Sequence, residues 1–331
     1  MLLEKQKYLV VGGTTMDIIC HADNIEKINL SHYKTSEKVI CIKFASKTPL
    51  SDFVLDYGGS AANSACALSK IGARVDLISC VGRDYFGGAC INNIKDFGVS
   101  TNFVKRKGQK TGFGVSIITS DGEKSVLVYR GANDNLSARD ISEKEITKVD
   151  YVLLTSLVSR ENFHLFKKTL NLCKKKGKPI IFAPSISMLR KYKKELKKLE
   201  DIFDLTIMNL EEARYYTSRL DIKDVIKKLP GVVKVVTADV SGAYAYDGNK
   251  ILKVGIVPLK VIDATGAGDA FSACFCYEFF RSKSVERALE FASICASLKV
   301  THTGARFNKS TKDINFALKK YKRYLKVKEI L

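Results

Sequence analysis

The stretch VIDATGAGDAFSACF, residues 261–275, combines the residue types of an anion-binding turn with those of a general base. Gly266, Ala267 and Gly268 precede an apolar run that predicts a helix. A helix N-terminus exposes unpaired N–H groups and the positive end of the helix dipole, and glycines let an anion approach the backbone closely. Asp269 falls in the first turn, where its carboxylate could accept a proton from a hydroxyl that attacks a phosphoryl group.

The same stretch is also compatible with an ordinary helix start that has no catalytic function. Acidic residues are common in first turns, and Asp263 or Thr265 could serve as the N-cap. No Walker-type lysine follows the glycines. The pattern alone therefore leaves two interpretations open, and the rest of the chain must decide between them.

The elements that would position Asp269 follow an α/β order. KYLVVGG (7–13) predicts a buried strand, with Asp17 soon after it, and GGSAANSACALSKIG (58–72) predicts a turn and then a helix. Further strands are predicted at 151–157, 179–185, 205–210 and 232–238, with helices between them. Such alternation indicates a parallel sheet with right-handed crossovers.

Two segments depart from this alternation. Residues 14–57 contain short β-like pieces, and residues 101–133 contain alternating β-rich runs broken by glycines. We expect them to pair as a small β lid. No Pro/Ser-rich linker divides the chain, so we predict one domain over residues 1–331, with lid strands inserted at about 14–57 and 101–133.

The composition excludes several other classes of protein. The chain has 331 residues, 46% of them hydrophobic, which suffices for a large core. The first residues lack a signal-peptide pattern and no apolar stretch has the roughly 20 residues that a membrane span needs, so we predict a soluble, cytoplasmic protein without a membrane partner. The 9 cysteines show no paired spacing, which favours buried, reduced thiols over disulfides or zinc ligands.

The formal net charge of +20 could indicate a nucleic-acid partner. However, many lysines alternate with apolar residues at helical spacing, as in 191–200 and 317–328, which is typical of solvated helix faces. No stretch interleaves aromatics and basic residues as an RNA-binding sheet would. We therefore expect no specific nucleic-acid partner, and attraction of anionic small molecules is the better use of the charge.

Residues 58–87 and 263–271 together resemble the two signature regions of the ribokinase (PfkB) family of small-molecule kinases. The order of the other motifs along residues 8–310 matches as well. The resemblance implies a ribokinase-like three-layer α/β/α domain with a central, mostly parallel sheet and a small β-strand lid. It also implies an ATP-dependent kinase that transfers the γ-phosphoryl group to a hydroxyl of a sugar or sugar-like substrate. A nucleoside kinase of the same family, of adenosine or cytidine type, is the alternative.

The resemblance assigns roles to residues at matching positions. Asp269 matches the catalytic base, and Gly266, Ala267 and Gly268 match the anion hole. The substrate-binding positions correspond to Asp17, Gly58, Gly59 and Asn63, and the nucleotide-binding positions to Asn209, Thr237, Gly242 and Ser293. Relatives with a β lid often pair their lids, so the resemblance also suggests a homodimer through the lid.

The same resemblance implies ATP and Mg²⁺ as cofactors, and potassium is a candidate third. Glu212 matches the acid that organises Mg²⁺ through water, although Asn209 and the acids after it also read as a plain helix N-cap and first turn. A monovalent cation is bound in some relatives at positions that correspond to Asp263, Thr265, Val300 and Gly304. Asp239 stands where the family has glycine, which leaves the geometry of that loop open.

Overall fold

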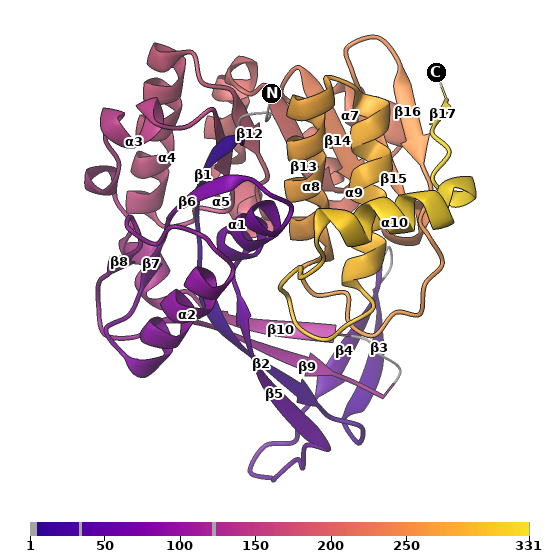
Figure 1. Cartoon of the computed structure of the whole chain (residues 1–331). Coiled ribbons are helices and arrows are strands. Elements are labelled where there is room, and N and C mark those ends of the chain that lie inside the picture. The colour runs from indigo at the N-terminus through magenta and orange to yellow at the C-terminus, as the bar shows by residue number, and fades with distance from the viewer. Residues whose placement is uncertain (1–4, 33–34, 121–123, 331) are drawn as a thin grey trace.

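The computed structural model describes residues 5–32, 35–120 and 124–330 (Figure 1). Its largest sheet has nine strands. Its order is β17 (Lys328–Glu329), β16 (Ile251–Val254), β15 (Ala243–Tyr246), β14 (Val233–Thr237), β13 (Leu205–Asn209), β12 (Ile180–Phe182), β11 (Tyr151–Leu154), β1 (Lys7–Val11) and β6 (Arg74–Ile78). The strands from β14 to β6 are parallel, and β15, β16 and β17 are antiparallel additions. This confirms the predicted mostly parallel sheet.

Helices cover both faces of the nine-stranded sheet. One face carries α1 (Ser60–Lys70), α8 (Ala267–Ser282), α9 (Val285–Lys299) and α10 (Thr311–Lys320). The other carries α3 (Glu143–Thr147), α4 (Arg160–Lys176), α5 (Ile186–Leu196), α6 (Leu210–Thr217) and α7 (Ile222–Lys227). Strand β1 shows why, since Tyr8 and Val10 pack into one core and Leu9 and Val11 into the other. The α/β/α layering is therefore confirmed.

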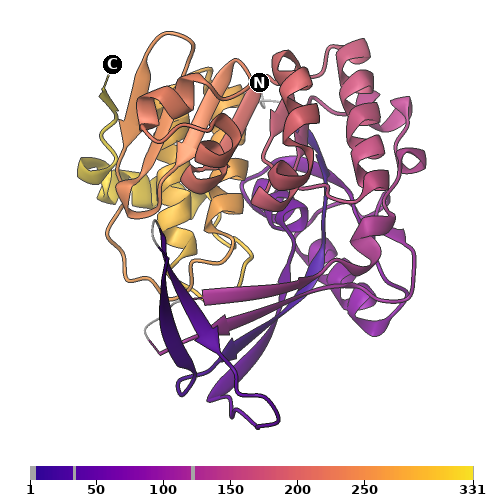
Figure 2. The ribbon, with the colours of Figure 1, turned by 180° about the vertical axis from the view of Figure 1, so that it is seen from behind.

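A second sheet, here called the small sheet, projects from one end of the layers (Figure 2). Its order is β10 (Lys124–Tyr129), β9 (Gly112–Ile118), β2 (Thr15–His21) and β5 (Asp52–Gly58), so it joins strands from both segments expected to form a lid. The described residues also form a hairpin of β3 (Glu26–His32) and β4 (Thr35–Cys41) and a short pair of β7 (Cys80–Val81) and β8 (Lys105–Arg106). The division into a single domain with two insertions remains a prediction.

The helical interpretation of residues 317–328 is wrong in its second half. Helix α10 ends at Lys320, a 3₁₀ turn covers Lys322–Tyr324, and the chain then enters β17. Leu325 is buried in the core and Val327 packs against it, a spacing of two residues that suits extended chain rather than a helix. Helix α2 (Tyr85–Asp96) begins after Asp84, whose side chain accepts a hydrogen bond from Gly87 N.

All nine cysteines are free thiols, and all but Cys41 are buried. In the described ranges, the helices are too short or too polar for any of them to cross a bilayer.

Candidate active site

Helix α8 begins at a glycine and not at a polar side chain. Gly266 is the N-cap with a φ of 77°, and no side chain caps this end. A Cβ on Gly266 would lie 2.1 Å from the Ala305 carbonyl oxygen, so both the backbone angle and the packing require glycine. The alternative in which Asp263 or Thr265 caps the helix is wrong, because the Asp263 carboxylate instead accepts hydrogen bonds from Thr265 within the preceding turn.

The first turn of α8 leaves backbone N–H groups without an intrahelical acceptor. Ala267 donates to the Ala264 carbonyl at 3.2 Å, and the first helical bond runs from Ala270 to Gly266 at 2.9 Å. The amides of Gly268 and Asp269 precede that bond and have no intrahelical acceptor. A Cβ on Gly268 would meet no atom within 4 Å. The turn therefore has both the free donors and the room that an anion needs.

Asp269 lies in this first turn and is held by α1. Asn63 Nδ2 donates to Asp269 Oδ2 at 2.7 Å. Burial raises the pKa of Asp269 to about 6, with a further increase from Asp17, while Asn63, Arg306 and Ser60 act in the opposite direction. A carboxylate with a pKa near 6 is ionised at neutral pH and is a better proton acceptor than an ordinary aspartate.

Arg306 fixes the orientation of Asn63, and sequence reasoning assigned it no role. Its Nη1 donates to Asn63 Oδ1, its Nε donates to Asn93 Oδ1 at 3.1 Å, and the residue is only 7% exposed. Because the Asn63 oxygen faces the guanidinium, the amide nitrogen must face Asp269. The sequence signal was an arginine at the end of the TGAR run 303–306, without any indication of its partner.

Asp17 projects from β2 between two glycines of neighbouring strands. A Cβ on Gly58 would lie 2.0 Å from Asp17 Oδ2, and a Cβ on Gly114 would lie 2.7 Å from Oδ1. Thr15 Oγ1 donates to the same carboxylate at 2.8 Å. Burial raises the pKa of Asp17, with an added contribution from Asp56. Gly58 is therefore small because the Asp17 carboxylate occupies the space that a side chain would need.

Two contacts join the small sheet to the loops around α8. Lys124 Nζ on β10 donates to Thr265 Oγ1 at 2.8 Å, and the Ala305 amide donates to Asp56 Oδ2 on β5 at 2.7 Å. Asp17, Asp56 and Lys124 thus reach the site from three different strands of one sheet. None of the long-range partners of Asp56 and Lys124 was predicted.

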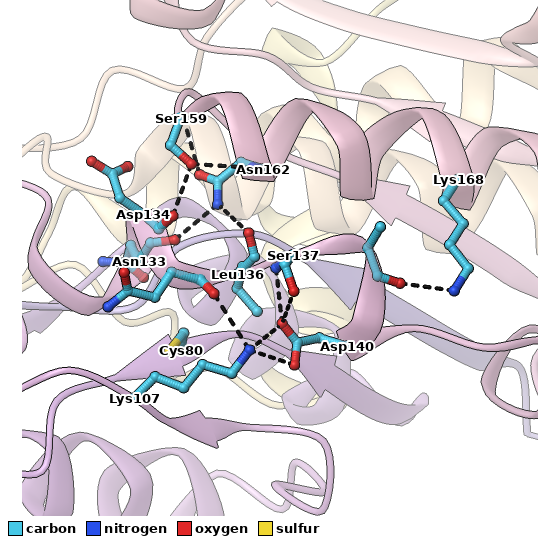
Figure 3. A network of polar contacts seen from close by, with 12 residues as sticks. Cys80, Lys107, Asn133, Asp134, Leu136, Ser137, Asp140, Ser159, Asn162 and Lys168 are labelled. Atoms are coloured by element: carbon cyan, nitrogen blue, oxygen red, sulfur yellow. Dashed lines mark hydrogen bonds and ion pairs between the residues drawn. The ribbon is translucent and has the colours of Figure 1, made fainter.

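The chain at the start of β2, three residues before Asp17, is held through Asn133 by the polar network of Figure 3. The side chain of Asn133 accepts from Thr14 N at 2.9 Å and donates to Thr14 O at 2.8 Å, just before β2 begins. Asn162 on α4 donates to the Asn133 carbonyl at 3.1 Å, and Lys107 forms an ion pair with Asp140 at 2.5 Å. The start of β2 is therefore tied to the main body through the side-chain amides of Asn133 and Asn162.

Asn209 and Glu212 form a capping box at the start of α6. Asn209 Oδ1 accepts from Glu212 N at 2.8 Å, and Glu212 Oε2 accepts from Asn209 N at 2.9 Å. The interpretation of Asn209 as a helix N-cap, followed by acidic residues in the first turn, is therefore confirmed. Burial raises the pKa of Glu212 to about 7, and the Glu211 and Asp269 charges add to the increase. A group of three or more metal-ligating side chains is absent from the described residues.

The loop after β14 accommodates the substitution of aspartate for the family glycine. Asp239 has a φ of 44°, in the left-handed region that glycine adopts easily, so the backbone keeps a shape that glycine would give. Gly242 follows with a φ of 87°, and a Cβ there would lie 2.0 Å from the Val254 carbonyl oxygen. Thr237, at the end of β14, and this loop flank the start of α6 across the β13–β14 pair.

Ser293 and the predicted monovalent-cation residues already have partners in the protein. Ser293 is 4% exposed, and its Oγ donates to the Gly255 carbonyl at 2.6 Å. Asp263 Oδ2 accepts from Gly304 N at 2.9 Å, and the Val300 carbonyl accepts from Asp263 N at 3.2 Å. A nucleotide contact of Ser293 stays a prediction.

The chain is similar in sequence and in fold to known proteins. A family model described as the pfkB family carbohydrate kinase matches residues 6–312. A curated ribokinase from Bacillus subtilis (strain 168) is 28% identical over 308 residues, which are 92% of this chain and 96% of that relative.

The solved structures give the same fold. An adenosine kinase from Sinorhizobium meliloti superposes with a TM-score of 0.79 at 22% identity, covering 96% of this chain and 99% of that chain. A putative ribokinase II from E. coli, in complex with ATP and Mg²⁺, superposes with a TM-score of 0.77 at 20% identity over 96% and 99% of the two chains. The predicted ribokinase-like fold is confirmed. The chain belongs to the pfkB family of carbohydrate kinases, which makes it a phosphotransferase.

Proposed function

We propose that this protein transfers the γ-phosphoryl group of ATP to a hydroxyl of a sugar or sugar-like substrate, with Asp269 as the catalytic base. The observation that carries the proposal is the position of Asp269, whose pKa is raised to about 6, next to the open N–H groups of the first turn of α8. An anion-binding turn and a proton acceptor at adjacent positions are what phosphoryl transfer to a hydroxyl requires.

In the proposed step, the substrate hydroxyl oxygen forms a bond to the γ-phosphorus. The bond from that phosphorus to the β,γ-bridging oxygen breaks, and ADP leaves with the electron pair of the broken bond. The hydroxyl proton moves to the Asp269 carboxylate. The amides of Gly268 and Asp269 bind the charge on the transferred group, and Asn63 holds the carboxylate in position.

Asp17 would orient the acceptor from the opposite side of the site. Its carboxylate is partly buried and has Thr15 as a hydrogen-bond donor, so a substrate hydroxyl would be a further donor to it. Gly59 and Asn63 line the start of α1 beside it. The contacts of Lys124 and Asp56 with the loops around α8 support a role of the small sheet as a lid that excludes water during transfer.

The nucleotide would lie over the carboxyl ends of β13 and β14, beside Asn209, Thr237 and Gly242. Glu212 fits an indirect Mg²⁺ contact, because its carboxylate is held by backbone N–H groups and a nearby divalent cation would favour its ionised form. Mg²⁺ bound there would neutralise charge on the phosphates. One carboxylate suffices, since Mg²⁺ keeps several waters.

The substrate class is tested by ADP release with ATP and Mg²⁺ against ribose, fructose, 2-keto-3-deoxygluconate, adenosine and cytidine. We expect at least one sugar to be phosphorylated, with the Asp269→Asn variant as the control for hydrolysis by contaminants. Turnover of the nucleosides alone would favour the nucleoside-kinase alternative. Absence of turnover with a broad panel of sugars, nucleosides and polyols would contradict a kinase function.

We also propose that two copies pair through the small sheet. Strand β10 is an edge strand whose side chains Val126, Leu127, Val128 and Tyr129 are all exposed. Exposed apolar edge strands of this kind favour pairing with another strand. Sedimentation should show a dimer that Leu127→Lys weakens, and a wild-type chain that stays monomeric at all concentrations would contradict the proposal.

A further inference from the structure

Lys299 is a lysine in a place where lysines are rarely found. It is the last residue of α9, it is 0% exposed, and it is among the largest fully buried side chains of the protein. A buried ammonium group is costly unless it is paired or well hydrogen-bonded. No sequence pattern assigns a role to Lys299, so its buried position needs a physical reason.

The ammonium group lies between the two loops that meet at the start of α8. Its Nζ donates to the Asp263 carbonyl at 3.4 Å and to the His302 carbonyl at 3.3 Å. Asp263 belongs to the loop that leads into Gly266, and His302 belongs to the loop that leads to Ala305. Since a Cβ on Gly266 would lie 2.1 Å from Ala305 O, these loops are in contact directly behind the anion-binding turn.

The surroundings favour a cation at this position. The C-terminus of α9 presents the negative end of its dipole, and the Asp263 and Asp56 carboxylates act on Lys299 as opposite charges. Burial lowers the pKa of Lys299, and these two carboxylates oppose that effect, while Lys124 adds to it. The charge is therefore balanced by the same two residues that organise the loops and the small sheet.

The residues predicted to hold a monovalent cation do not fit a bound ion as well as they fit this lysine. The Val300 carbonyl already accepts from Ile262 N at 2.7 Å and from Asp263 N at 3.2 Å. The Asp263 carboxylate accepts from Thr265 N, Thr265 Oγ1 and Gly304 N at 2.8, 2.6 and 2.9 Å. Thr265 Oγ1 in turn accepts from Lys124. The polar atoms are used, and two lysine ammonium groups already lie among them.

We propose that Lys299 is an internal replacement for a monovalent cation, a positioning residue whose ammonium group holds the 263–266 and 300–305 loops together behind the anion hole. The proposal rests on the proposed kinase function for its effect on turnover, but its structural part does not. The chain would then need no potassium. Removal of the ammonium group would create a cation requirement that the wild-type chain lacks.

The test compares the wild-type chain with Lys299→Ala in potassium, ammonium, methylammonium and tetramethylammonium chloride at equal ionic strength. Thermal unfolding of the wild-type chain should not distinguish these salts. The unfolding midpoint of Lys299→Ala should rise with potassium or the small ammonium ions, which fit the vacated space, because a ligand of the folded state stabilises it. Turnover of this variant should fall on the order of 10-fold to 100-fold and recover with the same ions.

Two further variants make the result specific. Lys299→Met keeps an apolar stem in the same space, so it should lose turnover without recovery by any cation. Lys168, on α4, has an ammonium group that donates to the Ala138 carbonyl at 2.8 Å (Figure 3). Lys168→Ala removes this group, and the unfolding midpoint and the turnover of this variant should not depend on the salt. Activation or stabilisation of the wild-type chain by potassium would overturn the proposal, as would a Lys299→Ala variant that folds but responds to no cation. The unfolding measurement gives this answer even if no acceptor is found.

Discussion

Helices α1 and α8 both begin at a glycine, and the two starts serve different purposes. Gly59 and Gly266 have φ values of 92° and 77°, and neither helix has a side-chain cap. At α1, a Cβ on Gly59 would lie 2.5 Å from the Gly13 carbonyl oxygen, and the Ala62 amide donates to that same oxygen at 3.4 Å. The start of α1 is therefore closed by the backbone between β1 and β2.

The start of α8 is open by comparison. A Cβ on Gly268 would meet nothing within 4 Å, and the Gly268 and Asp269 amides of this turn have no intrahelical acceptor. The two starts are joined by the hydrogen bond from Asn63 on α1 to Asp269 on α8. The difference shows that a glycine-rich helix start can signify tight packing or ligand access, and that only its partners in the fold distinguish the two.

The largest expected effect comes from the carboxylate that only the α8 start carries. Asp269→Asn should reduce turnover on the order of 10²–10⁴-fold, because the amide cannot accept the hydroxyl proton. Binding of ATP, measured by calorimetry, should change little. Near-normal turnover in this variant would remove Asp269 as the base.

The next effect tests the open turn. Gly268→Val should reduce turnover on the order of 10²–10³-fold, since its side chain would occupy the space before the amides. Its free energy of unfolding should stay close to that of the wild type, because the side chain enters empty space. Gly268→Ala should lose less. Unchanged turnover in the valine variant would refute the anion hole.

A smaller effect, on stability and not on chemistry, is expected at the closed start. Gly59→Ala should cost on the order of 3 kcal/mol in urea unfolding, because the φ of 92° and the contact with Gly13 both exclude a Cβ. Gly88→Ala on α2 is the matched control, since a Cβ there meets nothing within 4 Å, and it should not destabilise the protein. Equal stabilities of the two variants would contradict the distinction between the starts.

The local features of the site could be predicted from the sequence, and its long-range contacts could not. The turn at Gly266 and the position of Asp269 depend on neighbouring residues, so their pattern was visible. Arg306 and Lys299 act on partners far along the chain or across a loop, and no periodic pattern indicates such partners. The helical interpretation of 317–328 failed because burial of Leu325 against the core outweighs local helix propensity.

The central claim is that a carboxylate with a raised pKa accepts the substrate proton beside the open turn, and a pH profile of kcat/KM tests it most directly. Burial raises the pKa of Asp269 to about 6, and only the ionised form can act as a base. Activity should therefore be present above pH 6 and fall about tenfold per unit below it. The fall should vanish from the residual activity of Asp269→Asn and persist in Glu212→Gln. A flat profile in the wild type, or the same fall in Asp269→Asn, would contradict the claim.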